Sequence, residues 1–196
     1  MKQPGQITVV CGSMFAGKTE ELIRRARRAL YARKKVQVFK PAIDSRFDAA
    51  RVVSHMGVAL ESTPVNGVAE LVSHVLPETE VILVEECQFF DDRIIEVVLG
   101  WADSGKEVVV AGLDQDFRRM PFGPMPQLLA MADEVVKLRA ICIRCGGLAS
   151  HTQRLVDGKP AKWDDPIVLV GATESYEARC RRCHQISRPR RQGFKL

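Results

Sequence analysis

The stretch that decides the fold is Gly12-Ser13-Met14-Phe15-Ala16-Gly17-Lys18-Thr19, which fits the phosphate-binding pattern Gly-x-x-x-x-Gly-Lys-Ser/Thr without a mismatch. Its glycines allow the backbone to wrap around phosphates with successive N–H groups pointing inward, and a helix that follows adds the positive end of its dipole. Lys18 is expected to reach the terminal phosphates, and Thr19 the magnesium ion. The stretch therefore predicts that the protein binds a nucleoside triphosphate, without naming a reaction.

The residues on either side of this loop support that interpretation. Ile7–Cys11 is an apolar run that is typical of a buried strand, and a helix follows in which apolar residues recur at helical spacing while arginines take the opposite face. The apolar positions are Leu22, Ile23, Ala26, Ala29 and Leu30, and the arginines are Arg24, Arg25, Arg27 and Arg28. The alternative is a Gly-rich turn with an incidental lysine, which the succession of strand, loop and helix disfavours.

Strands and helices alternate along the chain up to residue 140. Continuous apolar runs are typical of parallel strands buried on both faces, and segments with helical periodicity separate them. The expected strands are Val36–Phe39, ended by Lys40-Pro41, Val81–Val84, Val108–Gly112 and Glu134–Leu138; the expected helices are Val68–Val75, Phe90–Ala102 and Leu128–Ala132. This order predicts a three-layer P-loop (RecA-like) α/β domain over residues 1–140, a parallel sheet flanked by helices, with ligands at the carboxyl ends of the strands.

Two adjacent acids follow the expected strand Val81–Val84. Carboxylates at the end of a buried strand are costly, whereas a phosphate-loop enzyme needs an acid at this point to hold magnesium directly or through water. Glu85 and Glu86 are therefore candidates for catalysis and for metal binding. Leu113–Phe117 is expected to face the same site, and Arg46 lies in a polar loop over residues 42–51, where the alternative is an ordinary solvated arginine.

The character of the chain changes near residue 141, where turn-forming residues replace periodic segments and paired cysteines appear. Two Cys-x-x-Cys pairs, Cys142 with Cys145 and Cys180 with Cys183, supply four thiolates for a tetrahedral structural zinc site. They predict a small zinc-binding domain over residues 141–196. A metal-free set of buried thiols is one alternative, and a redox pair is another that needs only one Cys-x-x-Cys. His184 is not expected to be a ligand.

Composition limits the remaining possibilities. The chain has 196 residues, of which 46% are hydrophobic, so it can bury a proper core. No apolar run approaches the ~20 residues that span a bilayer, and a secretion signal is lacking, so we expect a cytoplasmic protein without membrane association. The net charge of +5 comes largely from the first helix and the tail Arg188–Lys195. Solvated basic faces are favoured over binding of nucleic acid, because aromatic residues do not interleave with the charges.

Taken together, the motifs and their order resemble the type II thymidine kinases, the zinc-containing cytosolic enzymes of nucleotide salvage for DNA synthesis. The resemblance runs from Ile7 to about His184. It rests on the phosphate loop, Asp44-Ser45-Arg46, Glu86-Cys87-Gln88-Phe89-Phe90, Gly112-Leu113-Asp114, Pro121-Phe122-Gly123 and the two cysteine pairs.

The resemblance implies a reaction and a set of site residues. The γ-phosphate of ATP would pass to the 5′-hydroxyl of thymidine, with deoxyuridine as a further acceptor, while Glu86 acts as general base, Arg46 steadies charge and Gln88 lies close to the nucleotide. Residues matching the nucleoside site are Met14, Phe89, Leu113, Phe117 and Thr152, whose apolar members could equally be ordinary core. The segment between the cysteine pairs matches a lasso loop that closes over the base through Val168–Tyr176, in which Val168, Val170, Gly171 and Tyr176 would contact the substrate.

The resemblance also implies a homotetramer and feedback inhibition by thymidine triphosphate. One departure is Glu85, because family members commonly have Asp before the catalytic Glu. Glu85 would help Thr19 to bind magnesium, and an exchange of roles between Glu85 and Glu86 stays open.

Two rival functions also stay open. One is a kinase for another deoxynucleoside, and the other is a nucleic-acid-dependent ATPase or adaptor that grips the polymer with its zinc domain and basic tail.

Overall fold

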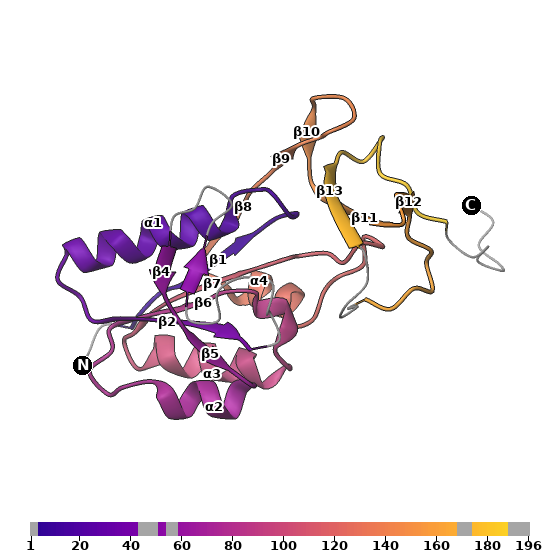
Figure 1. The fold of residues 1–196 in the computed structure, drawn as a ribbon. Helices are drawn as coiled ribbons and strands as arrows, with labels where there is room; N and C mark the ends of the chain where they lie inside the picture. The colour runs from indigo at the N-terminus through magenta and orange to yellow at the C-terminus, as the bar shows by residue number, and fades with distance from the viewer. Residues whose placement is uncertain (1–3, 43–50, 54–58, 168–173, 188–196) are drawn as a thin grey trace.

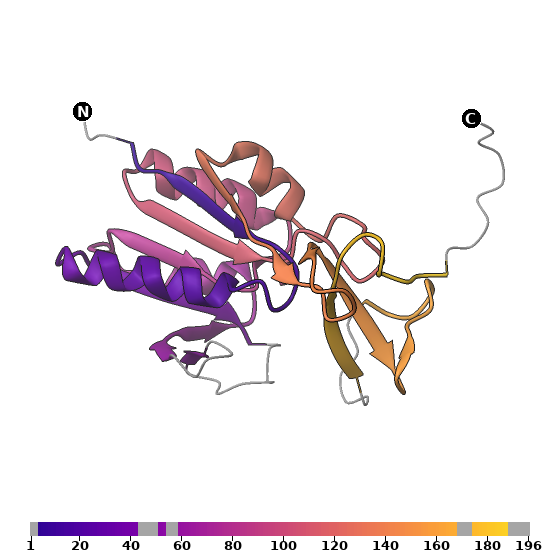
Figure 2. The same ribbon diagram turned by 90° about the horizontal axis from the view of Figure 1, so that it is seen from above.

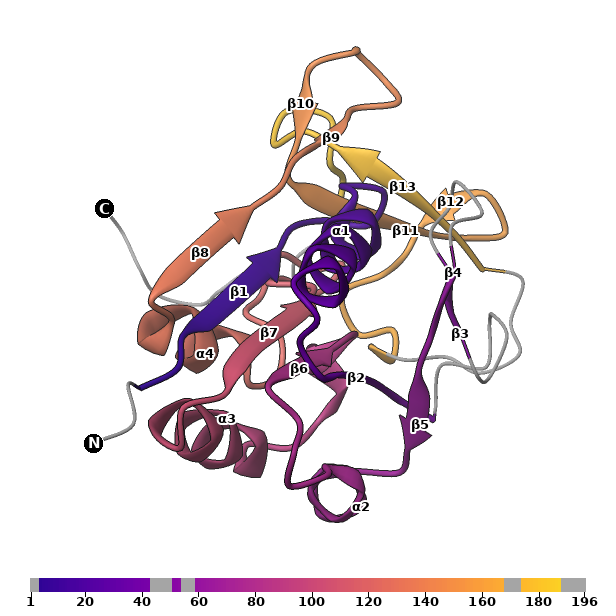
Figure 3. The same ribbon diagram turned by 90° about the vertical axis from the view of Figure 1, so that its left-hand side faces the viewer.

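The computed structural model of the protein describes residues 4–42, 51–53, 59–167 and 174–187. Its main feature is a six-stranded sheet in the order β5-β2-β6-β7-β1-β8, in which every pairing is parallel (Figures 1 and 3). The strands are β1 (Ile7–Cys11), β2 (Val36–Pro41), β5 (Thr63–Val65), β6 (Val81–Val84), β7 (Glu107–Gly112) and β8 (Glu134–Lys137). This confirms the predicted parallel α/β fold.

Helices cover both faces of this sheet. Helix α1 (Lys18–Tyr31) covers one face, while α2 (Val68–His74), α3 (Arg93–Asp103) and α4 (Met125–Met131) cover the other (Figure 1). Helix α1 begins where the phosphate loop ends, and its first turn carries Glu20 and Glu21, whose charge suits the positive end of the helix dipole. Among the described residues, no helix has both the length and the apolar composition needed to cross a membrane.

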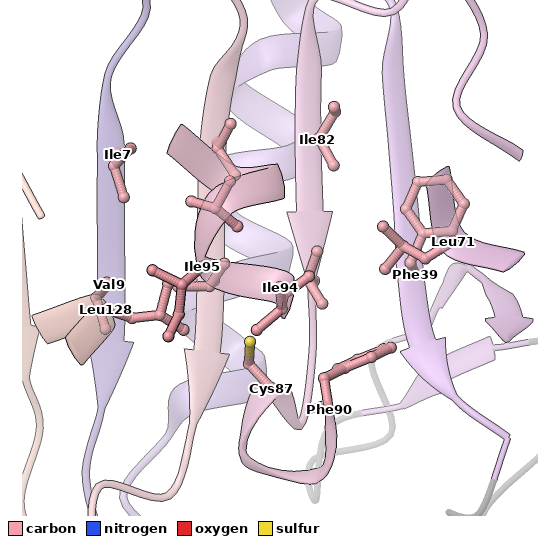
Figure 4. Packing of buried hydrophobic residues seen from close by; sticks show 14 of the residues in the cluster. Ile7, Val9, Phe39, Leu71, Ile82, Cys87, Phe90, Ile94, Ile95 and Leu128 are labelled. Carbon is pink, nitrogen blue, oxygen red and sulfur yellow. The ribbon is translucent and has the colours of Figure 1, made fainter. Parts of the chain in front are cut away.

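The side chains of each central strand alternate between two cores. Along β6, Ile82 and Val84 face α2 and α3, whereas Val81 and Leu83 face α1. Figure 4 shows the first of these cores, where Cys87 lies among Ile94, Leu128 and other apolar residues. Burial raises the pKa of the Cys87 thiol to about 12. Cys87 therefore serves as a protonated packing residue.

Several element boundaries differ from those expected. Helix α3 begins at Arg93 rather than Phe90, because a 3-10 turn, η1 (Cys87–Phe89), occupies the first residues after the strand-end acids. Helix α4 begins at Met125 rather than Leu128. Strand β2 continues to Pro41, where the missing N–H does not matter because β6 ends its pairing at Phe39.

Two side chains of α1 also differ from the expected amphipathic pattern. Leu30 is 49% exposed although it was expected on the buried face. Arg25 was expected on the solvent face but is half-buried, and its guanidinium forms two hydrogen bonds of 2.9 Å with the carboxylate of Glu134. The ion pair draws Arg25 toward the edge strand β8, which the helical period alone could not indicate.

The chain after residue 140 forms small antiparallel sheets at the carboxyl ends of the parallel strands (Figure 2). Strand β11 (His151–Val156) lies between β12 (Lys159–Pro160) and β13 (Glu174–Arg179), and β9 (Ala140–Ile141) pairs with β10 (Leu148–Ala149). Separately, β3 (Arg51–Val53) pairs in antiparallel fashion with β4 (Ala59–Glu61).

Candidate active site

The phosphate loop connects β1 to α1 and depends on two glycines. Gly12 has a φ of 146°, and a Cβ added to it would lie 2.5 Å from the carbonyl oxygen of Leu138. Gly17 has a φ of 88° and caps the amino end of α1. Both values lie in the region that favours glycine, so the loop needs glycine at these positions for backbone reasons.

Lys18 lies at the start of α1 and turns back over the loop. Its Nζ donates a 3.1 Å hydrogen bond to the carbonyl oxygen of Ser13. Burial lowers the pKa of Lys18, and the carboxylates of Glu86, Glu85 and Asp114 oppose this shift. The Lys18 amine is thus partly shielded from water and lies beside several acids. This arrangement suits a polyphosphate ligand that binds together with a metal ion.

Glu85 and Thr19 meet at the carboxyl edge of the sheet. The Thr19 hydroxyl donates to Oε1 of Glu85 over 2.5 Å, and Glu85 is 8% exposed. The backbone N–H of Glu85 donates to the carbonyl of Phe39 on the neighbouring strand β2, which fixes the start of the turn. A hydroxyl and a carboxylate oxygen are ligands of the kind that Mg²⁺ prefers. The pair can therefore hold magnesium with triphosphate oxygens.

Glu86 has a left-handed backbone, with φ 49° and ψ 42°, and its side chain has a different partner from that of Glu85. Its carboxylate accepts a hydrogen bond from the Gln88 side-chain amide, and the amide oxygen of Gln88 accepts from the N–H of Leu113 over 3.0 Å. Gly112 leaves the room for this bridge, because a Cβ there would lie 2.6 Å from the Gln88 oxygen. Gln88 thus links the acid after β6 to the loop after β7.

The residues expected around a nucleoside come from four separate segments: the phosphate loop, the turn after β6, the loop after β7, and β11. Phe89 is half-buried and packs edge-on against Phe122, with ring centroids 5.6 Å apart. Phe117 is buried, and the guanidinium of Arg154 lies 5.2 Å from its ring centroid. In the phosphate loop, the Met14 N–H donates to the Thr152 hydroxyl over 3.0 Å.

Leu113 and Tyr176 are two further expected site residues that the structure describes. Leu113 is half-buried and takes part through its backbone N–H. Tyr176 is half-buried on β13, where it pairs across the ladder with Arg154. Arg46, Val168, Val170 and Gly171 lie outside the described residues.

The four paired cysteines come together as a candidate metal site. Their sulfur atoms all lie within 4.8 Å of one another, and Sγ of Cys145 is 3.7 Å from Sγ of Cys180. A tetrahedral zinc ion with Zn–S bonds of about 2.3 Å places its sulfurs roughly 3.8 Å apart, so the cluster fits such an ion. Backbone hydrogen bonding from Cys183 lowers the pKa of the Cys180 thiol, which favours a thiolate ligand. Metal-free buried thiols do not explain this convergence, because Cys145 is exposed.

Both pairs form the same kind of turn, in which the residue after the second cysteine donates its N–H to the carbonyl of the first. Gly146 donates to Cys142 over 2.8 Å, and His184 donates to Cys180 over 2.9 Å. His184 is not part of the sulfur cluster. Its Nε2 instead donates to the carbonyl of Phe117 over 3.0 Å, which ties the second cysteine pair to the loop after β7.

Two features of the site were not predicted from the sequence. Lys137, at the end of β8, forms a 2.8 Å ion pair with buried Asp114, which follows β7. The position of Lys137 at the end of a predicted parallel strand is a signal that could have found it. The contact between Thr152 and Met14 spans 138 residues, and no local signal indicates it.

Comparison with known proteins identifies the family. A family model described as thymidine kinase matches residues 5–184. Among solved structures, domain III of the Thermotoga maritima replication initiation protein DnaA matches 67% of this chain and 54% of that chain, with a TM-score of 0.41 and 15% identity. The chain thus spans about half of that chain's length, and so distant a likeness carries no argument here. Because the family model includes the phosphate loop, both strand-end acids and all four paired cysteines, the chain belongs to the thymidine kinase family.

Proposed function

We propose that this protein transfers the γ-phosphate of ATP to the 5′-hydroxyl of thymidine, with deoxyuridine as a further acceptor. The observation that carries the proposal is the position of Glu86. It follows β6, which β7 separates from the phosphate-loop strand β1. It acts electrostatically on Lys18 and is linked through Gln88 to Leu113. An acid in this position, in a member of the thymidine kinase family, suits removal of a hydroxyl proton near the terminal phosphate.

The phosphate loop and its neighbours are proposed to bind the nucleotide. Backbone N–H groups of residues 12–19 would surround the phosphates, and Lys18 would leave the Ser13 carbonyl to contact them. Thr19 and Glu85 would hold magnesium, since their oxygens already meet over 2.5 Å. Bound magnesium neutralises charge on the phosphate oxygens. The Gln88 bridge keeps the Glu86 carboxylate at the edge of this site.

The acceptor side is proposed to combine a rigid wall with a closing segment. Phe89, Phe117, Met14 and Thr152 would form the wall, and residues 168–176 would close over the base. The clustered sulfurs of the two cysteine pairs support this assignment, because a structural zinc ion would hold both ends of the intervening segment. Arg46 is proposed to steady charge on the transferring phosphoryl group, by resemblance to the family.

We extend the proposal to the organisation of the whole protein. Residues 1–140 would form the nucleotide-binding domain and residues 141–196 the zinc-binding domain of a cytoplasmic homotetramer that thymidine triphosphate inhibits. Light scattering during size-exclusion chromatography tests the tetramer, since a monomeric mass at working concentration would contradict it. Inhibition by thymidine triphosphate, measured at saturating ATP, tests the feedback.

Acceptor-dependent consumption of ATP tests the proposed function. The protein, ATP and magnesium are incubated with each deoxynucleoside in turn, and formation of ADP is followed. We expect thymidine to stimulate formation of ADP most strongly. Stimulation by another deoxynucleoside alone would favour the kinase of different specificity, and stimulation by single-stranded or duplex DNA would favour the nucleic-acid-dependent ATPase.

A further inference from the structure

The peptide bond between Ser13 and Met14, inside the phosphate loop, is held at both of its ends. Its carbonyl oxygen accepts hydrogen bonds from Nζ of Lys18 over 3.1 Å and from the N–H of Ala16 over 3.3 Å. Its N–H donates to the Thr152 hydroxyl over 3.0 Å. Two of these partners belong to the loop and its helix, whereas Thr152 comes from β11.

Thr152 is itself firmly placed. It is 4% exposed and lies in a strand whose first five residues are all buried. Across the ladder it pairs with Ala178 of β13, two residues before Cys180. The hydroxyl therefore approaches the loop from a strand anchored beside the cysteine cluster.

A second contact joins the same two parts of the molecule. Ala16, at the tip of the phosphate loop, packs against a small apolar cluster that contains Cys142 and Ala178, with Cys180 and Cys183 at its margin. A methyl group packed on a cluster limits translation of the loop but cannot fix the rotation of a peptide bond. A directional hydrogen bond can fix it, and the Thr152 hydroxyl supplies one.

We propose that Thr152 is a positioning residue for the phosphate loop. Its hydroxyl accepts a hydrogen bond from the Met14 N–H and so sets the orientation of the Ser13–Met14 peptide bond. In the nucleotide-free protein, this orientation places the Ser13 carbonyl where it accepts a hydrogen bond from Lys18. This role goes beyond the contact with the nucleoside that the proposed function gives to Thr152. It concerns nucleotide binding alone and does not depend on which acceptor is phosphorylated.

The consequence of losing the hydroxyl follows from the rigidity of the Ser13–Met14 peptide bond, whose N–H and carbonyl turn together. Without the Thr152 hydroxyl, the Met14 N–H either lacks this acceptor or finds another when the Ser13–Met14 peptide bond rotates. Because the peptide bond is planar, that rotation moves the Ser13 carbonyl away from Lys18. The loop must then be reordered when phosphates bind. Affinity for the nucleotide therefore falls, even when no nucleoside is present.

Calorimetric titration of the full chain with MgATP, without nucleoside, tests the proposal. We expect Thr152→Val to weaken binding about 10-fold, the loss of one partly buried hydrogen bond, while Thr152→Ser, which keeps the hydroxyl, stays within about 2-fold of wild type. Thr79→Val is the matched control. Thr79 is also a buried threonine, 3% exposed, and its hydroxyl bonds to Gln37 away from the loop. It should bind MgATP as the wild type does.

Hydrogen exchange of the Met14 amide provides the second measurement. Circular dichroism and zinc content first establish that each variant is folded, and the Met14 amide should then exchange faster in Thr152→Val than in the other proteins. Unchanged MgATP affinity together with an equally protected Met14 amide would overturn the proposal, leaving Thr152 as a wall of the nucleoside site. Because no nucleoside is used, neither result decides whether thymidine is the acceptor.

Discussion

The two adjacent acids after β6 have different partners because the backbone turns between them. Glu85 accepts from the hydroxyl of Thr19, whereas the left-handed conformation of Glu86 directs its carboxylate to Gln88. This division matches the proposed roles, in which Glu85 binds magnesium and Glu86 receives the hydroxyl proton. The longer side chain of Glu85, where the family commonly has Asp, is accommodated by direct contact with Thr19.

Replacement of the proposed base should affect turnover far more than binding. Glu86→Gln keeps the shape of the side chain but cannot accept a proton, so turnover should fall about 10²- to 10⁴-fold while MgATP still binds. Steady-state kinetics and calorimetry measure the two effects. Glu85→Asp is the comparison variant and should retain most activity; near-normal turnover of Glu86→Gln, with severe loss in Glu85→Asp, would show that the two acids have exchanged roles.

Lys18 should be indispensable for a different reason. Its partly buried cation is the group that would contact the terminal phosphates, so Lys18→Ala should abolish phosphoryl transfer. Lys34→Ala is a suitable control, because Lys34 forms an exposed ion pair with Glu107, of a kind that contributes little to stability. Normal turnover in Lys18→Ala would exclude the phosphate loop from the reaction.

His151 makes the stability of the protein sensitive to acid. Burial, with smaller contributions from His184, Arg181 and Arg119, lowers the pKa of His151 to about 4. The unfolded chain takes up this proton below a pKa of about 6.5, so stability is complete above that pH and is lost as pH falls toward 4, by up to about 3 kcal/mol.

The prediction is tested by urea unfolding at pH 7.5 and pH 5. The free energy of unfolding should fall less on acidification in His151→Gln than in the wild type, and the exposed control His74→Gln should behave as the wild type does. Loss of metal in acid affects all three proteins alike. An unchanged pH dependence in His151→Gln would refute the assignment.

At the scale of elements, the two cysteine turns close a segment of 34 residues, 146–179, whose closing part is proposed to cover the base. Removal of zinc, or Cys180→Ser together with Cys183→Ser, should weaken thymidine binding strongly, because loop closure then depends on weak local contacts. ATP binding should fall less, through loss of support from Thr152 and Ala16.

Calorimetry of both ligands on the metal-free protein measures these effects, with circular dichroism to show that the parallel sheet is folded. Equal loss of both ligands would mean that zinc supports the entire fold. Undiminished affinity for thymidine would mean that the segment does not close over the base.

The elements that the sequence could predict are those with a local signal. The sequence predicted five of the six strands of the parallel sheet but not the short edge strand β5 (Thr63–Val65), which carries no apolar run. The phosphate-loop pattern indicated both the place of the loop and its conformation. Strands β11 and β13 carry buried polar residues, among them Gln153, Arg154 and Arg179, so no period of hydrophobicity marks them. Their burial depends on partners such as the Pro166 carbonyl for Arg154 and the Cys183 carbonyl for Arg179.

At the scale of the whole molecule, the candidate site joins segments that are far apart in the chain. The motif could predict Lys18, Thr19 and the strand-end acids, because parallel strands present their carboxyl ends at one edge. The same rule could have found the ion pair of Lys137 with Asp114, which lie at the carboxyl ends of β8 and β7. The motif could not predict the contacts from Thr152 to Met14 and His184 to Phe117, since these arise only when the small sheets pack against that edge. Such contacts depend on tertiary packing, which a spacing pattern does not encode.

The central claim is that the protein transfers phosphate to a nucleoside hydroxyl and does not merely hydrolyse ATP. Phosphorus NMR of a reaction containing ATP, magnesium and thymidine tests it most directly, because ADP, inorganic phosphate and a phosphate monoester give separate signals. We predict a monoester that grows in step with ADP, that couples to the 5′ protons of the sugar, and that is absent when 5′-deoxythymidine replaces thymidine. Formation of inorganic phosphate without a monoester, or the same monoester yield from Glu86→Gln, would contradict the account.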